Sequence, residues 1–187
     1  MIRRRDPAAE RLLDAAARVF TERGPGAGMA EVAAAAGVGR ATLYRYFPSR
    51  DALLRGLVEA AAAEVEQRIA DADVDAVDAR EGVARLCRGF MTAGARYAFL
   101  ANLGDEPQKD PEMARRLNEP VRRLLERGVA EGRIRSDLPI EVLFALFTGL
   151  VTQALRLLAD GAAGPEQACA AVVSVFFDGV EPRDTPK

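Results

Sequence analysis

Apolar residues in this chain recur every three or four positions, in one segment after another, and glycine or proline separates the segments. This spacing is the period of an α-helix that buries one face. Alanine fills 36 of the 187 positions and arginine fills 24, and both are strong helix formers, whereas β-branched and aromatic residues are sparse. We therefore predict an all-α protein of about nine helices with no strand.

The helix breaks place the expected elements. Asp6 before Pro7 is typical of an N-cap followed by proline at the first helical position. Gly37 can adopt the left-handed conformation that ends a short helix, and Pro120 predicts a kink or a break inside its helix. Residues 102–110 read as a loop or a short helical turn. The expected helices lie near 7–23, 29–36, 40–47, 50–70, 74–99, 111–132, 139–159 and 165–178.

The segment 139–159 is apolar on nearly all sides, so we expect it to be buried. Its strictly apolar run looks too short to span a bilayer, and we predict no membrane association. The basic residues Arg3, Arg4 and Arg5 are not followed by the apolar run of a secretory signal. The sequence therefore favours a cytoplasmic protein.

Charge is unevenly distributed along the chain. The net charge of the whole is −2, but residues 1–50 carry nine basic and five acidic side chains, a net of +4, which leaves −6 for residues 51–187. A basic end on an acidic body suggests that this end meets a polyanion. The chain has no histidine, which excludes Ser-His-Asp and Cys-His catalysis and histidine metal sites.

Other residues that could carry chemistry have simpler interpretations. Cys87 and Cys169 lie in apolar stretches, so we predict two buried thiols rather than a redox switch. The segment 71–75 resembles the start of a calcium loop, but Ala76 and Gly82 stand where such a loop needs glycine and glutamate. We expect no metal and no cofactor.

Two short helices joined by a tight glycine turn are the outline of a helix-turn-helix, here over residues 29–47. The second helix leaves an arginine-rich face with small side chains, and such residues can bind guanine and thymine in a major groove. The apolar positions that can fix the angle between the two helices are Val32, Ala33, Ala36, Val38, Leu43 and Phe47.

The run from Glu31 to Leu54, EVAAAAGVGRATLYRYFPSRDALL, resembles the signature of TetR-type regulators. The leading helix, with Ala15-Ala16 and Val19-Phe20 followed by Arg23-Gly24, is also similar to that family. The resemblance covers about residues 8–56. It implies a homodimeric all-α transcription regulator, usually a repressor, rather than an enzyme.

The resemblance also implies the DNA contacts. It assigns base or phosphate contacts to Arg40, Ala41, Thr42, Tyr44 and Arg45, and DNA-backbone contacts to Tyr46 and Arg50. This chain has Met29, after Gly28, and Gly39 where the family often has threonine and serine, so we expect altered contacts at these two sites rather than lost binding.

From the residues alone, two contacts have alternatives. Arg45 could pair with an acidic residue, and Tyr44 could be partly core. The basic segment 3–5 could reach a minor groove or remain a solvated tail.

We expect residues 1–50 to form the DNA-binding domain and residues 51–187 a helical domain for ligand binding and dimerisation. Small residues on the last two helices suit either a two-fold interface or an intramolecular core, and the family resemblance favours the interface. They are Ala145, Gly149, Thr152, Ala168, Ala171, Val172 and Val175. A two-fold dimer predicts an inverted-repeat operator on double-stranded DNA.

A pocket for an unidentified small-molecule effector is a further hypothesis. Arg88, Arg96, Asn102 and Gln153 could orient a polar group of the effector. The same lining residues would equally make an ordinary core; they are Phe90, Met91, Tyr97, Phe99, Leu117, Val121, Phe144, Phe147 and Thr148. The alternatives are a helical adaptor that answers to a protein partner or to no ligand, and an enzyme, for which only Lys109 offers an internal lysine.

Overall fold

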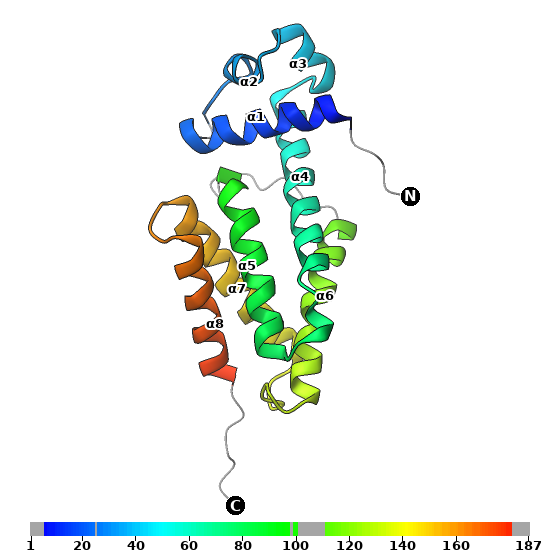
Figure 1. The fold of residues 1–187 in the computed structure, drawn as a ribbon, viewed down its shortest axis with the longest axis vertical. Helices are drawn as coiled ribbons and strands as arrows, with labels where there is room; N and C mark the ends of the chain where they lie inside the picture. The colour runs from blue at the N-terminus through cyan, green and yellow to red at the C-terminus, as the bar shows by residue number, and fades with distance from the viewer. Residues whose placement is uncertain (1–5, 25, 98, 101–110, 181–187) are drawn as a thin grey trace, which may run out of the picture.

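The computed structural model describes residues 6–24, 26–97, 99–100 and 111–180, and all regular elements in these ranges are helical (Figure 1). The all-α prediction is confirmed, with eight α-helices against about nine expected. The segment 3–5, Asn102 and Lys109 lie outside the described residues. The elements are α1 (Pro7–Arg23), α2 (Met29–Ala35), α3 (Arg40–Tyr46), α4 (Arg50–Asp71), the 3-10 turn η1 (Val74–Ala76), α5 (Ala79–Tyr97), α6 (Pro111–Ala130), α7 (Ile140–Ala159) and α8 (Pro165–Val180).

The predicted start of the first helix is confirmed. The Asp6 side chain accepts a hydrogen bond of 2.8 Å from the backbone N–H of Ala8, and Pro7 is the first residue of α1. The helix ends where Gly24 takes a φ of +81° and donates its N–H to the Phe20 carbonyl. Both ends of α1 therefore follow from local sequence.

One predicted boundary is wrong, and one of the two outcomes predicted at Pro120, a break, does not occur. The helix expected from residue 74 begins at Ala79, because Asp73 adopts a left-handed φ of 44° and η1 intervenes. Arg127 of α6 holds this segment by donating to the carbonyls of Val74 and Val77, a long-range contact that no local pattern encodes. Pro120 does not break α6, which runs continuously through it.

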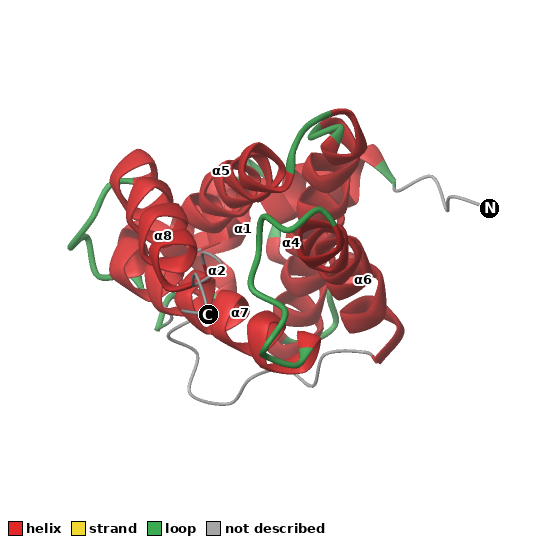
Figure 2. Ribbon diagram, turned by 90° about the horizontal axis from the view of Figure 1, so that it is seen from below, coloured by secondary structure: helices red, strands yellow, loops and turns green. Residues whose placement is uncertain are grey.

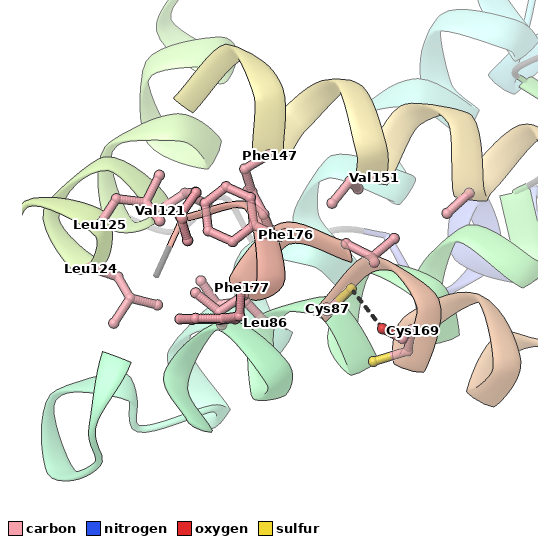
Figure 3. Packing of buried hydrophobic residues seen from close by; sticks show 14 of the residues in the cluster. Leu86, Cys87, Val121, Leu124, Leu125, Phe147, Val151, Cys169, Phe176 and Phe177 are labelled. Carbon is pink, nitrogen blue, oxygen red and sulfur yellow. Dashed lines mark hydrogen bonds between the residues drawn. The ribbon is translucent and has the colours of Figure 1, made fainter. Parts of the chain in front are cut away.

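The apolar side chains form two clusters. The first joins α1 to the segment from α2 to the N-terminal half of α4. It also includes Tyr97 at the end of α5 and Phe99 just beyond it. The second lies among α5, α6, α7 and α8 (Figure 3). In Figure 1 α1 lies across one end of the bundle that α4 to α8 form, with α2 and α3 beyond it. The division expected at residue 50 stays a prediction, since α4 contributes to both clusters.

The sequence predicted that α7 is buried on all sides, and this prediction is wrong. Only 22% of an 18-residue apolar stretch of α7 is buried, and Val142, Leu146 and Leu157 are exposed. The view along the bundle shows why, because α7 packs at the periphery beside α8 (Figure 2). By length and composition α7 could cross a membrane, contrary to the prediction, although the core helix of a soluble protein passes the same test.

The two cysteines meet between α5 and α8. The Cys87 thiol lies 4.0 Å from the Cys169 carbonyl, and the Cys169 thiol lies 3.8 Å from the Ala84 carbonyl (Figure 3). Burial, with a further contribution from Cys169, raises the pKa of the Cys87 thiol. A raised pKa suppresses the reactive thiolate of Cys87, and both cysteines are free and buried, as predicted.

Candidate nucleic-acid interface

The start of α2 is capped by a carboxylate rather than by a hydroxyl. The Gly28 backbone N–H donates to Glu31 Oε2 at 2.8 Å, and Arg23 Nη1 donates to Glu31 Oε1 at 2.6 Å. These two contacts, the backbone bond first, hold the pKa of Glu31 below its ordinary value. The sequence analysis missed this cap, although an acid three residues after the N-cap position is its usual signal.

The turn between α2 and α3 depends on Gly37, whose φ is +67° as predicted. The N–H of Gly37 donates to the Ala34 carbonyl and the N–H of Val38 to the Ala33 carbonyl, which closes the end of α2. The Gly39 carbonyl then accepts the first bonds of α3, from Thr42 and Leu43. Local backbone chemistry therefore fixes the angle between the two short helices.

The six apolar positions predicted between these helices pack as expected. Val32 and Leu43 are fully buried, Ala33 and Phe47 are buried, and Ala36 and Val38 pack against the same cluster. Because the core takes one side of α3, its other side chains face away from the protein. In Figure 1 α3 lies at the end of the molecule farthest from the loop that joins α6 to α7.

The outward face of α3 collects most of the predicted contacts. Gly39, Arg40, Ala41, Tyr44 and Arg45 are exposed. Tyr44 has 46% of its surface exposed, so it lies outside the buried core and presents a large part of its side chain to solvent. Thr42, Tyr46, Met29 and Arg50 are half-buried at the margins of the same surface.

Arg45 is positioned by an aromatic ring. Its guanidinium carbon lies 5.3 Å from the centre of the Tyr46 ring, within the range of a cation–π contact. In the described part of the chain, no carboxylate lies within ion-pair distance of Arg45 or Arg40. The interpretation of Arg45 as one half of an ion pair is therefore not supported, and its donors are available to a polyanion.

Arg50 begins α4 directly behind Ser49, whose hydroxyl caps the helix by accepting from the Ala52 N–H at 3.1 Å. Its guanidinium carbon lies 5.6 Å from the centre of the Phe20 ring in α1. A half-buried arginine at a helix N-terminus favours a nearby anion. Together, an exposed arginine-bearing helix, a tight glycine turn and flanking cations define a helix-turn-helix DNA-binding protein.

Comparison with known proteins matches the helix-turn-helix segment to a family. Residues 12–57 match the model described as bacterial regulatory proteins, tetR family. The chain is 64% identical over 52 residues to the HTH-type transcriptional regulator MT1294 of Mycobacterium tuberculosis, which is described as uncharacterized; this match spans 27% of the chain and 26% of that relative. It is 27% identical over 164 residues, 82% of each chain, to the HTH-type transcriptional repressor AcnR of Corynebacterium efficiens.

The fold agrees over almost the whole length. The regulator LfrR of Mycobacterium smegmatis, solved in complex with proflavine, superposes with a TM-score of 0.76 at 24% identity, over 97% of this chain and 100% of that chain. The helix-turn-helix segment is thus similar to that of TetR-type regulators, and the chain shares their fold, with an N-terminal helix-turn-helix and a C-terminal helical domain. The family consists of regulators rather than enzymes.

The structure does not bring the nine predicted effector-site residues together. Met91, Val121 and Phe147 are buried in the second cluster, and Phe90 and Phe144 pack against it. Leu117 and Thr148 are half-buried on α6 and α7, and Thr148 donates to the Phe144 carbonyl. Tyr97 and Phe99 lie instead in the first cluster, against α1.

The polar residues expected near an effector also separate. Arg96 pairs with Asp14 and Glu64, and Gln153 is exposed on α7. Arg88 lines an open depression of about 340 Å³ between α4 and α5, which none of the nine predicted effector-site residues lines. Each arginine of this depression already donates to a glutamate.

The residues predicted for dimerisation divide into two groups. Ala145, Gly149, Thr152, Ala171 and Val175 are exposed, whereas Ala168 and Val172 point into the second cluster. Around the first group lie Val142, Leu146 and Leu157, large exposed apolar residues that the sequence analysis did not select. The apolar character of α7 on nearly all sides was the signal that could have identified them.

Proposed function

We propose that this protein represses transcription by binding an inverted-repeat operator as a homodimer, and that a small organic effector releases it. The observation that carries the proposal is the outward face of α3, where Arg40, Tyr44 and Arg45 project from a rigid helix-turn-helix. In this division of labour residues 1–50 bind DNA, and residues 51–187 bind the effector and the second copy.

The second copy covers the exposed apolar face of α7 and α8. On α7 the exposed residues follow a helical stripe of Val142, Leu146, Gly149, Gln153 and Leu157. Val175 on α8 has 59% of its surface exposed. Contiguous exposed apolar residues mark interaction surfaces in soluble proteins, and a two-fold pairing of α7 and α8 gives a four-helix interface.

A dimer explains this face better than a lipid bilayer does. Gln153 and Arg156 lie within the exposed side of α7, and Glu141 stands at its start. Charged and amide groups at these positions are costly in hydrocarbon but suit the polar edge of a protein interface. The protein then works in the cytoplasm, where its DNA is.

The effector is a small apolar or amphipathic molecule. The neighbour LfrR was solved in complex with proflavine. The candidate lining residues Met91, Val121 and Phe147 are packed in a closed core. An effector that enters there must open the helices of the second cluster, which supplies a differential affinity between two states of the dimer.

A footprint on the region upstream of the protein's own gene tests the proposal. We expect protection of two half-sites about one helical turn apart, and protection that weakens steeply as salt is added. Absence of protection at low salt would refute operator binding. The alternative function, a helical adaptor for a protein partner or for no ligand, is favoured if the footprint appears but no compound in a thermal-shift screen releases it.

A further inference from the structure

The end of α5 docks onto the DNA-binding helices. Tyr97 and Phe99 were predicted for an effector pocket, but both are buried in the first cluster with Phe20 and Leu57. This is the place where the C-terminal bundle meets α1 directly, beyond the continuous helix α4.

Polar contacts fix the same junction. Arg96 donates to Asp14 of α1 at 2.5 Å and to Glu64 of α4 at 3.4 Å. The Thr21 hydroxyl donates to the Arg96 carbonyl at 3.3 Å. Arg96, Asp14 and Thr21 are exposed and Glu64 is half-buried, so each bond contributes little to stability, but together they set where the end of α5 lies on α1.

Aromatic packing continues the junction to a predicted DNA contact. The Phe99 ring stacks on Phe20 with a centroid distance of 5.3 Å and an interplanar angle of 28°. The Arg50 guanidinium carbon lies 5.6 Å from the centre of the same Phe20 ring. Phe20 and Phe99 have only 1% and 5% of their surface exposed, so both rings are held by their surroundings.

A fixed ring restricts a flexible cation. The long arginine side chain loses rotamer freedom when its guanidinium stays near an aromatic ring, and a charge that is already placed loses less entropy when it meets a phosphate. Phe99 comes from outside residues 1–50, and it supports the Phe20 ring against which Arg50 lies. The position of α5 therefore bears on how well Arg50 is placed.

We infer that Phe99 is a positioning residue for DNA binding: through Phe20 it holds the Arg50 guanidinium where a DNA phosphate can reach it. This inference rests on the proposed operator binding. It makes the junction between α5 and α1 the route by which a movement of the C-terminal bundle changes affinity for the DNA backbone, without any change in the recognition face of α3.

The test compares salt dependence of binding to a duplex that carries the footprinted site. Each lost phosphate contact lowers the slope of log affinity against log salt by about 0.9 for B-DNA. We expect Arg50→Gln to lower the slope by about 0.9 per protomer, and Phe99→Leu to lower it toward the same value. The double variant should lower it no further than Arg50→Gln alone.

Two controls separate positioning from general damage. Phe90→Leu removes a phenylalanine of α5 that packs against the second cluster, and it should lower the melting temperature without changing the slope. Phe99→Tyr keeps the ring and should restore the slope. Circular dichroism confirms that each variant is folded at the temperature of the binding measurement.

The outcomes are distinct. A wild-type slope in folded Phe99→Leu, with a lowered slope in Arg50→Gln, overturns the inference and leaves operator binding intact. An unchanged slope in Arg50→Gln also overturns it, because Arg50 then contacts no phosphate. If the wild-type protein binds no duplex at any salt concentration, the proposed function fails and the inference fails with it.

Discussion

The N-terminal and the C-terminal part of the chain each leave one helix face uncovered, and the chemistry of the two faces is opposite. The face of α3 presents arginine, tyrosine and small side chains above a fully buried core. The face of α7 presents valine and leucine, interrupted by glycine and threonine. Charged surface suits a phosphate backbone, and apolar surface suits a second protein face. The contrast teaches that one chain carries two surfaces of different chemistry, one suited to the proposed DNA and the other to the proposed second copy.

The largest effect is expected from a charge placed on the apolar face. Leu146 has 52% of its surface exposed in the single chain. In the proposed dimer Leu146→Glu removes the burial of the exposed half of two leucines and places two unpaired carboxylates in an apolar interface, so dimerisation should weaken by about 3–6 kcal/mol. Sedimentation equilibrium measures the change, and operator binding should fall with it.

Asn118→Glu is the matched control, since it adds the same charge at an exposed position of α6. It should leave the dimer and the operator affinity unchanged. A dimer that persists in Leu146→Glu at wild-type strength would show that the second copy docks elsewhere, and the comparison between the two faces would lose its basis.

The next largest effect is expected on the charged face. Arg45→Ala and Tyr44→Ala each remove an exposed side chain of α3 that has no part in the buried core. Loss of a base contact costs about 1–3 kcal/mol per half-site, so the two half-sites together should reduce operator binding to the non-specific level. Fluorescence anisotropy with operator and scrambled duplexes measures this change.

These variants should keep the wild-type melting temperature and dimer. Arg11→Ala serves as the control, because Arg11 is an exposed arginine of α1 outside the helix-turn-helix. If Arg45→Ala retains full operator affinity and specificity, α3 is not the recognition helix, even though its face is exposed.

The sequence predicted the packing of the N-terminal part better than that of the C-terminal part, for physical reasons. At residues 29–47 the information is local: Gly37 sets the turn and Leu43 and Val32 set the angle, so their spacing alone predicted the packing. In the C-terminal part the information is long-range. Only the fold reveals that Arg127 holds η1, that Phe99 leaves the bundle for α1, and that Val172 turns inward while Val175 turns outward.

The candidate effector-site residues show most clearly what a single sequence does not predict. Phe147 and Phe144 are three positions apart on one helix, yet one is fully buried and the other half-buried against Arg122. Composition identifies both as core or pocket residues, but it does not say which helix lies opposite. Packing between distant segments decides that, and a single sequence carries no direct record of it.

A smaller effect distinguishes a buried glycine of α6 from an exposed glycine on the apolar face of α7. A Cβ on Gly128 of α6 would lie 2.9 Å from the Ala79 Cβ and 2.7 Å from Ile134 Cδ1. A Cβ on Gly149 of α7 meets nothing within 4 Å in the single chain. Overpacking costs about 1–3 kcal/mol and the gain in helix propensity returns about 1 kcal/mol, so Gly128→Ala should be destabilising by about 1 kcal/mol.

Gly149→Ala has no such cost within one chain, so the monomer should gain up to about 1 kcal/mol. In the dimer the added methyl group meets the second copy if the helices approach closely at this glycine. Urea denaturation measures stability and sedimentation measures association for both variants. A Gly149→Ala protein that is more stable and dimerises as tightly as wild type would place the close approach away from Gly149.

The smallest effect concerns the cap that replaces a hydroxyl at the start of α2. Because the Gly28 N–H and Arg23 lower the pKa of Glu31 in the folded state, the carboxylate stabilises the fold at pH values above its unfolded pKa of about 4.5, and this contribution is lost as the pH falls through the lower folded pKa. Glu31→Gln should therefore lower the melting temperature slightly at pH 7, and the difference from wild type should shrink below pH 4.5.

Glu81→Gln is the counterpart in the C-terminal domain, where Arg85 chiefly lowers the pKa of the carboxyl group. Both variants should show the same pH dependence of stability, but only Glu31→Gln should weaken operator binding, because only Glu31 sets the start of the helix that supports α3. Equal effects of the two variants on operator binding would show that the cap contributes stability without positioning the DNA-binding face.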